Sequence, residues 1–115
     1  MFLKFPAKLK ILFTLNLGCV MTENLTVSKT LKVGNSMGLH ARPAAQLVHI
    51  AGRFQSELKL YRSDSRAEAD CRSVLAMLML AAGKDTELEL IAKGADASEA
   101  AEAMASYFQR NFDEA

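Results

Sequence analysis

The sequence predicts an α+β domain in which four strands form an antiparallel sheet with three helices on one of its faces. Segments in which apolar side chains alternate, as in strands, are interleaved with segments in which they recur at helical spacing. The order is strand, helix, strand, strand, helix, strand, helix. Each predicted strand has a single apolar face, which is typical of an antiparallel sheet that helices cover on one side.

The first strand and the first helix flank a turn. Residues 25–33 alternate as a strand, and Lys29, which interrupts the apolar row, is expected near an end or an edge of the sheet. Residues 43–54 carry apolar side chains at helical spacing. Pro43 suits the first helical turn, where a missing N–H loses nothing. A helix therefore begins close to His40.

The middle of the chain predicts a hairpin followed by a short apolar helix. Residues 56–62 alternate, and a strand at about 66–70 returns after a turn. Ser73 is placed to cap a helix that runs over residues 74–82 and stops at Gly83. This helix is apolar almost all round. One side is expected to face the sheet and the other to remain exposed as a docking surface.

One more strand and helix complete the domain. Residues 86–92 alternate as a strand. Asp96 and Glu99 then form a pair like a capping box, which predicts the start of a helix. Apolar side chains repeat at helical spacing from there to about Arg110.

Residues 1–20 are expected to lie outside the domain, which we assign to residues 21–115. Three lysines precede a short apolar run in this extension, as in a signal peptide. Met21, however, is followed by polar residues and then at once by a strand pattern. We favour a start codon assigned too early. An export or anchoring signal and a genuine extra segment are the alternatives.

Charge and cysteine content exclude several classes of protein. Of 14 basic residues, three precede Met21, so that 11 remain against 13 acidic ones. A domain so close to neutrality is a poor candidate for general nucleic-acid binding. Cys19 and Cys71 lack the spacing of a metal site, so we expect no metal and free thiols in a reducing compartment. No run reaches the roughly 18–20 apolar residues that membrane insertion needs.

The segment Gly-Leu-His-Ala-Arg-Pro-Ala at residues 38–44 places a histidine at a loop-to-helix junction. The first turn of a helix offers unpaired N–H groups and partial positive charge, which favour an anion such as phosphate. Arg42 adds a full charge and a planar donor group suited to phosphate oxygens. His40 and Arg42 are therefore candidates for reversible phosphorylation, with the helix start at Ala41 and Pro43 stabilising the phosphate.

This segment resembles the active-site signature of the HPr family, the histidine phosphocarriers of the bacterial phosphotransferase system. The resemblance covers residues 25–112, with the same order of elements. It implies an open-faced β-sandwich and a phosphoryl group on the His40 ring nitrogen nearer the backbone, with Arg42 assisting. Such a protein carries the phosphoryl group stoichiometrically rather than acting as a stand-alone enzyme, and needs no cofactor of its own.

The resemblance extends to the helix that Ser73 begins. Ser73 matches a serine that a dedicated kinase phosphorylates in many HPr proteins, and the alternative is a plain helix cap. In the family, partner proteins bind to this helix and to the helix after His40. The resemblance therefore implies that Val74, Leu75 and Leu78 face outward and contact partners. The alternative is that all three belong to the core. His49 lies on the polar stripe of the first helix, as a solvated residue or a partner contact.

The implied partners are enzyme I, which donates the phosphoryl group, IIA-type domains, which receive it, and an HPr serine kinase. We expect a cytoplasmic monomer that serves sugar transport. The run that begins at Glu68 and the ending at residues 111–114 look more like the nitrogen-branch NPr members of the family. A regulatory protein whose binding depends on its phosphorylation state is therefore the alternative.

Overall fold

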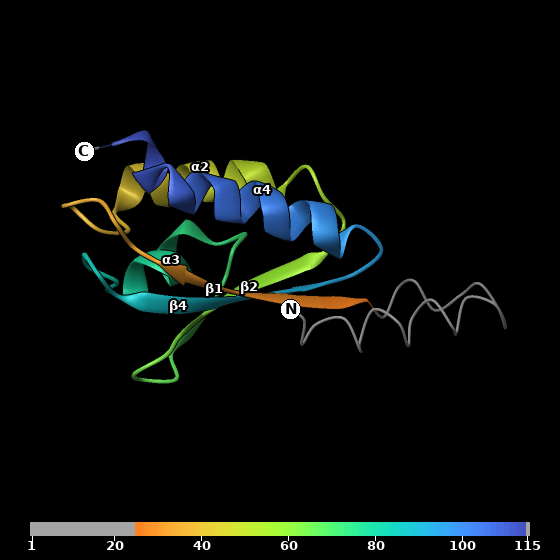
Figure 1. The fold of residues 1–115 in the computed structure, drawn as a ribbon, viewed down its shortest axis with the longest axis horizontal. Helices are drawn as coiled ribbons and strands as arrows, with labels where there is room; N and C mark the ends of the chain where they lie inside the picture. The colour runs from red at the N-terminus through yellow and green to blue at the C-terminus, as the bar shows by residue number, and fades with distance from the viewer. Residues whose placement is uncertain (1–24, 115) are drawn as a thin grey trace, which may run out of the picture.

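The computed structural model describes residues 25–114 and has the predicted order of elements. Strands form one antiparallel sheet in the order β1-β4-β2-β3. Figure 1 shows α2 and α4 side by side over one face of this sheet, while α3 packs against α2 and β3. The predicted α+β class is confirmed. The elements are β1 (Thr26–Lys32), α2 (Ala41–Ala51), β2 (Glu57–Arg62), β3 (Glu68–Asp70), α3 (Val74–Met79), β4 (Glu87–Lys93), α4 (Ala97–Gln109) and a short 3-10 helix, η2 (Asn111–Asp113).

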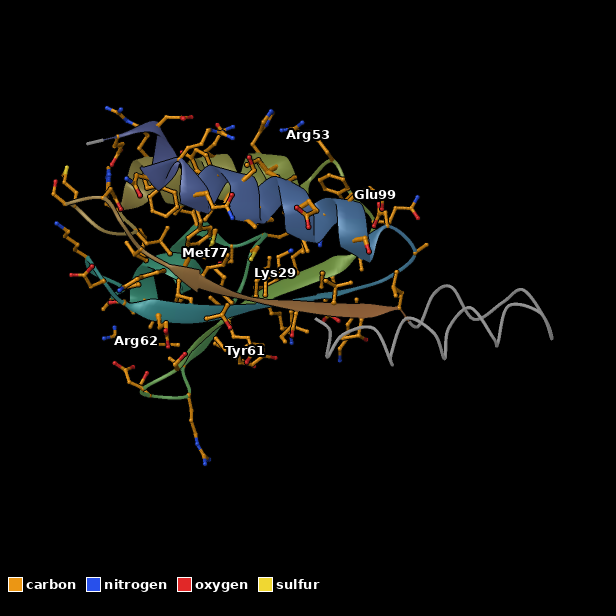
Figure 2. The ribbon with its side chains drawn as sticks, viewed as in Figure 1. Lys29, Arg53, Tyr61, Arg62, Met77 and Glu99 are labelled. Atoms are coloured by element: carbon orange, nitrogen blue, oxygen red, sulfur yellow. The ribbon has the colours of Figure 1, made fainter. Side chains whose placement is uncertain are left out.

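The core lies between the sheet and the helices, because every other residue of each strand points toward α2 and α4. Leucines of β2 and β4 and the alanine-rich face of α4 are almost fully buried there. Met77 joins this core from α3 (Figure 2). Lys29 lies on β1, an edge strand as predicted, and its Nζ is 2.8 Å from Glu102 Oε2 on α4. The lysine that interrupts the apolar row therefore ties the edge of the sheet to a helix.

Helix α3 is shorter than predicted, because the chain leaves the helical conformation before Gly83. Arg62 Nη1 donates to the carbonyls of Leu80 and Ala81 at 2.7 and 2.8 Å. Ala81 has a φ of 52°, in the left-handed region that ends helices. Helix α2, in turn, begins at Ala41, two residues before the predicted start. Proline is tolerated anywhere in a first turn, where N–H groups lack helical acceptors.

The predicted capping box at the start of α4 is wrong. Asp96 is the N-cap residue, but its side chain makes no capping hydrogen bond. Its carboxylate instead accepts from the backbone N–H groups of Gln55 and Ser56, each at 2.9 Å, and from the Ser56 hydroxyl. The Ser56 hydroxyl and these two amides lower the pKa of the Asp96 carboxyl. Asp96 therefore fastens the loop before β2 to α4.

Two loops are hydrogen-bonded to each other at one end of the sheet, and together they place His40. The Val33 N–H donates to the Thr86 carbonyl at 3.0 Å, and the Leu39 N–H donates to the Ala82 carbonyl at 2.9 Å. Gly38 has a φ of +73°, and a Cβ at this position would lie 2.7 Å from the Ala82 carbonyl oxygen. Only glycine accommodates both conditions without strain.

Within residues 25–114 no helix is both long and apolar enough to cross a bilayer. The extension at residues 1–20, and its predicted boundary at Met21, lie outside the described residues.

Removing the Asp96 clamp is expected to destabilise the fold. Asp96→Ala should lower the free energy of unfolding by about 1–2 kcal/mol. The variant loses the hydrogen bonds that the Asp96 carboxylate accepts, and this carboxylate is charged but partly exposed. The depressed carboxyl pKa makes this contribution full at neutral pH and lost as pH falls below about 4. Urea titrations at pH 7 and pH 3 measure both effects. Glu89→Ala, on an exposed carboxylate of β4, is the control, and an equal loss at both pH values would contradict the clamp.

Two nearby glycines are expected to respond differently to the same change. Gly38→Ala forces an alanine into a left-handed conformation, at a cost of about 1–2 kcal/mol, and also into contact with the neighbouring backbone. Its melting temperature should therefore fall by at least about 4 °C. A Cβ at Gly83 would meet nothing within 4 Å, so Gly83→Ala should melt like the parent protein. Equal melting temperatures for the two variants would show that the Gly38 conformation is not required.

Candidate functional site

His40 is the N-cap residue of α2, and its imidazole is not used as a cap. Its backbone is extended, with φ −97° and ψ −168°, and its carbonyl accepts from the Ala44 N–H at 3.0 Å. The backbone N–H groups of Ala41 and Arg42 follow in the first turn, where a helix provides no acceptors for them. Pro43 sits third, where the absence of its N–H leaves no bond unmade. The chain thus presents a partly exposed imidazole directly before two unengaged amide positions of a helix.

The imidazole contacts a carboxylate from the other end of the chain. Nε2 of His40 lies 3.0 Å from both Oε1 and Oε2 of Glu114. The hydrogen bond from His40 is the largest effect on this carboxyl and lowers its pKa, and a bond from Asn35 and the positive charge of Arg42 act in the same direction. Glu114 is therefore ionised at neutral pH.

Asn35 links this carboxylate to the loop that carries His40. Its side chain is fully buried, and its Nδ2 donates to Glu114 Oε1 at 2.8 Å and to the Gly38 carbonyl at 2.9 Å. An amide nitrogen with two acceptors fixes the orientation of the side chain. The same asparagine therefore sets the turn before His40 and the position of Glu114.

Helix η2 brings Glu114 back to the site. Asn111, Phe112 and Asp113 all have φ values near +57°, in the left-handed region. Phe112 holds this turn because its ring is buried against Tyr107 and Phe108, with centroids 5.2 and 4.8 Å away. Glu114 was not predicted from the sequence, since nothing in the local pattern shows that the chain reverses here.

The other predicted basic residues of α2 lie in different surroundings. Arg42 is exposed in the first turn, and among the described residues no side chain forms a hydrogen bond or an ion pair with it. It is close enough to Glu114 for its charge to lower the pKa of that carboxyl. His49 is exposed in the last turn of α2. His49 lies nine positions after His40, a rise of roughly 13 Å along the helix, so the two histidines are not brought together.

Helix α3 presents an apolar surface. Its Ser73 Oγ accepts from the Ala76 N–H at 3.0 Å, which confirms the predicted cap. Leu75 is 68% exposed and Leu78 is 36% exposed, whereas Val74 is only half-exposed and packs against the core. Two further exposed side chains, Met37 and Met79, were not predicted. We call Met37, Leu75, Leu78 and Met79 the apolar patch. Met37 precedes Gly38 in the loop that is bonded to Ala82 after α3.

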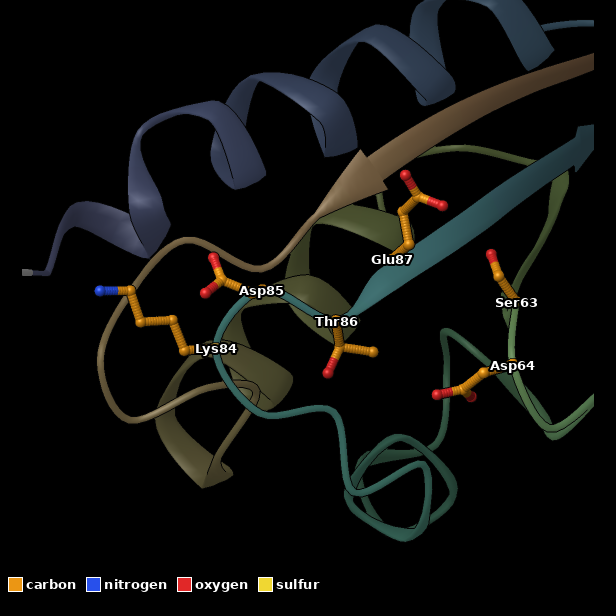
Figure 3. A pocket seen from close by; sticks show the side chains of 6 residues that line it. All are labelled: Ser63, Asp64, Lys84, Asp85, Thr86 and Glu87. Carbon is orange, nitrogen blue, oxygen red and sulfur yellow. The ribbon is translucent and has the colours of Figure 1, made fainter.

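Other reactive or concave features lie outside this site. Burial raises the pKa of the Cys71 thiol to about 12. An open hollow beside the hairpin is lined by Ser63, Asp64, Lys84, Asp85, Thr86 and Glu87 (Figure 3). Three carboxylates against one lysine disfavour phosphate there. Over residues 25–114 no group of three His, Cys, Asp or Glu side chains is placed to hold a metal ion.

Comparison with known proteins agrees with this geometry. The family model described as the PTS HPr component phosphorylation site matches residues 27–110. Phosphocarrier protein HPr of Treponema pallidum is 42% identical over 88 residues, covering 76% of this chain and 98% of that protein. Phosphocarrier protein NPr of Escherichia coli is 39% identical over 90 residues, covering 78% and 99%.

Solved structures agree as well. The crystal structure of a phosphocarrier protein HPr from Bacillus anthracis superimposes with a TM-score of 0.67 at 33% identity, covering 73% of this chain and 98% of that one. Sheet order, helix placement and the histidine at the helix start thus coincide with an extended sequence match. The chain belongs to the HPr family of phosphocarrier proteins of the phosphotransferase system.

Proposed function

We propose that His40 is the residue that carries the phosphoryl group, taking it from enzyme I on Nδ1 and passing it to IIA-type domains. The observation that carries this proposal is the partly exposed imidazole at the N-cap of α2, which makes no capping bond and contacts Glu114 only through Nε2. Ala41 and Arg42 contribute the amides of the first helical turn, and Pro43 fixes the backbone there. Donors and partial positive charge at such a position favour a bound phosphoryl group.

Arg42 neutralises charge during the transfer. Phosphoryl transfer proceeds by in-line displacement, and its catalysis is mostly positioning and electrostatic stabilisation. The Arg42 side chain is exposed and can turn its planar guanidinium to the phosphate oxygens when a partner docks. In this proposal His40 acts as the nucleophile without a metal ion bound to this protein.

The apolar patch beside this site is proposed as the docking surface for enzyme I and IIA-type domains. Its four side chains are exposed, and they come from two segments that a backbone hydrogen bond holds together beside His40. Exposed apolar side chains gathered in this way mark an interaction site. Val74 supports the patch from beneath, and His49 is too far along α2 to take part in the chemistry.

Regulation gives a second candidate function. The 39% identity to an NPr protein is compatible with a nitrogen-branch regulatory protein, whose partners distinguish the phosphorylated from the free form. Ser73 is half-exposed at the start of α3, next to Leu75, so a phosphate from an HPr serine kinase would add charge beside the apolar patch. In both readings the protein acts as a monomer in the cytoplasm.

Phosphorylation should depend on one histidine of the two. With enzyme I and labelled phosphoenolpyruvate, the label should be acid-labile and base-stable, as a phosphoramidate is. His40→Ala should abolish labelling, because the nucleophile is gone, while His49→Ala should label like the parent. Gel autoradiography after acid and base treatment measures this. A His40→Ala protein that still takes up label would overturn the assignment.

Charge placed on the apolar patch should weaken docking without unfolding the domain. Leu75→Glu and Met79→Glu should raise the apparent KM for enzyme I by roughly tenfold, since a glutamate loses its water in an apolar contact. Their melting temperatures should change little, because both side chains are exposed. Met77→Glu, in the same helix but fully buried, should instead unfold the protein. An unchanged KM in both exposed variants would move the docking surface elsewhere.

A further inference from the structure

We propose that Glu114 is a positioning residue for phosphoryl transfer, and that its carboxylate holds the His40 imidazole in the tautomer whose Nδ1 is the nucleophile. The inference rests on the proposed function and deepens it. Its starting point is the contact of Nε2 with both carboxylate oxygens at 3.0 Å.

The chemistry of the two partners fixes the proton. An ionised carboxylate can only accept hydrogen bonds, so the hydrogen must lie on Nε2. A neutral imidazole has a single N–H, which leaves the lone pair on Nδ1. Among the described residues no group donates to Nδ1, so this lone pair stays available. The two ring nitrogens point to different sides of the imidazole, and the carboxylate therefore leaves the reacting nitrogen uncovered.

The carboxylate is itself held in place from two directions. Asn35, fully buried, donates to its Oε1 at 2.8 Å. The buried Phe112 ring anchors η2, from which Glu114 follows directly. The Glu114 side chain is 15% exposed as a result, unlike an ordinary surface glutamate. An orienting group fixed in this way keeps the tautomer and the ring angle of a histidine constant.

This arrangement also suits the charge that the transfer creates. The Nδ1 lone pair forms the new N–P bond, and the bond from phosphorus to the donor group of enzyme I breaks, with its electron pair leaving on that group. The ring then holds the phosphoryl group on Nδ1 and the hydrogen on Nε2, and it bears a positive charge next to the Glu114 carboxylate. No proton has to leave the ring. Delivery to a IIA-type domain reverses these changes, and the lone pair returns to Nδ1.

The test compares Glu114→Ala and Glu114→Gln with Asp113→Asn, which removes the neighbouring carboxylate that pairs with Arg110. Nitrogen-15 NMR reads the tautomer from the Nδ1 and Nε2 shifts of neutral imidazoles. The exposed His49, the second of the chain's two histidines, is an internal reference. Rapid-quench measurements with phosphorylated enzyme I give the transfer rate, and thermal melting shows that each variant is folded.

Both Glu114 variants should lose the strong preference for the Nε2–H tautomer at His40 and transfer about tenfold more slowly. Asp113→Asn and the His49 signals should match the parent. An unchanged tautomer ratio, or an unchanged transfer rate, in Glu114→Ala and Glu114→Gln would overturn the proposal. The result is separate from that for His40→Ala: loss of the role of Glu114 leaves His40 as the labelled residue, whereas label on His40→Ala removes the proposed function itself.

Discussion

The pairing of two loops at one end of the sheet is the constraint on which the site depends. The bond from the Leu39 N–H to the Ala82 carbonyl joins the His40 loop to the segment that follows α3, and the bond from the Val33 N–H to the Thr86 carbonyl joins the same two loops further along. The left-handed Gly38 lets the two backbones approach closely enough for the first of these bonds. A single backbone arrangement thus places both the histidine and the apolar patch on one part of the surface.

The fold could be read from the sequence because its signals are local and agree with one another. Alternation in the strands, helical spacing in α2 and α4, and the Ser73 cap each depend on neighbouring residues. Element ends were less predictable. Helix α3 stops early because Ala81 takes a left-handed backbone conformation, and Arg62, which comes from β2, bonds the carbonyls of Leu80 and Ala81 beyond the helix end. Asp96 has the spacing of a cap, but Gln55 and Ser56 compete for its carboxylate from a distant loop.

The histidine, arginine and proline of the site were predictable because they fall within one short segment. Glu114 and Asn35 were not, since they lie 79 residues apart and meet only through the left-handed turn of η2. Met37 carried no periodic signal, because it lies in a loop, and its exposure is seen only in the structure. Residues that orient a reactive group are drawn from any part of the chain that the fold brings near, and sequence spacing does not reveal them.

The burial of Cys71 determines how its thiol reacts with oxidants. Oxidants attack thiolates, and a thiol whose pKa is raised to about 12 and whose side chain is fully buried remains protonated and out of reach at neutral pH. Peroxide that modifies exposed thiols of other proteins would therefore leave this position intact. In the folded domain Cys71 is therefore a structural thiol of the core and not a position at which oxidants act.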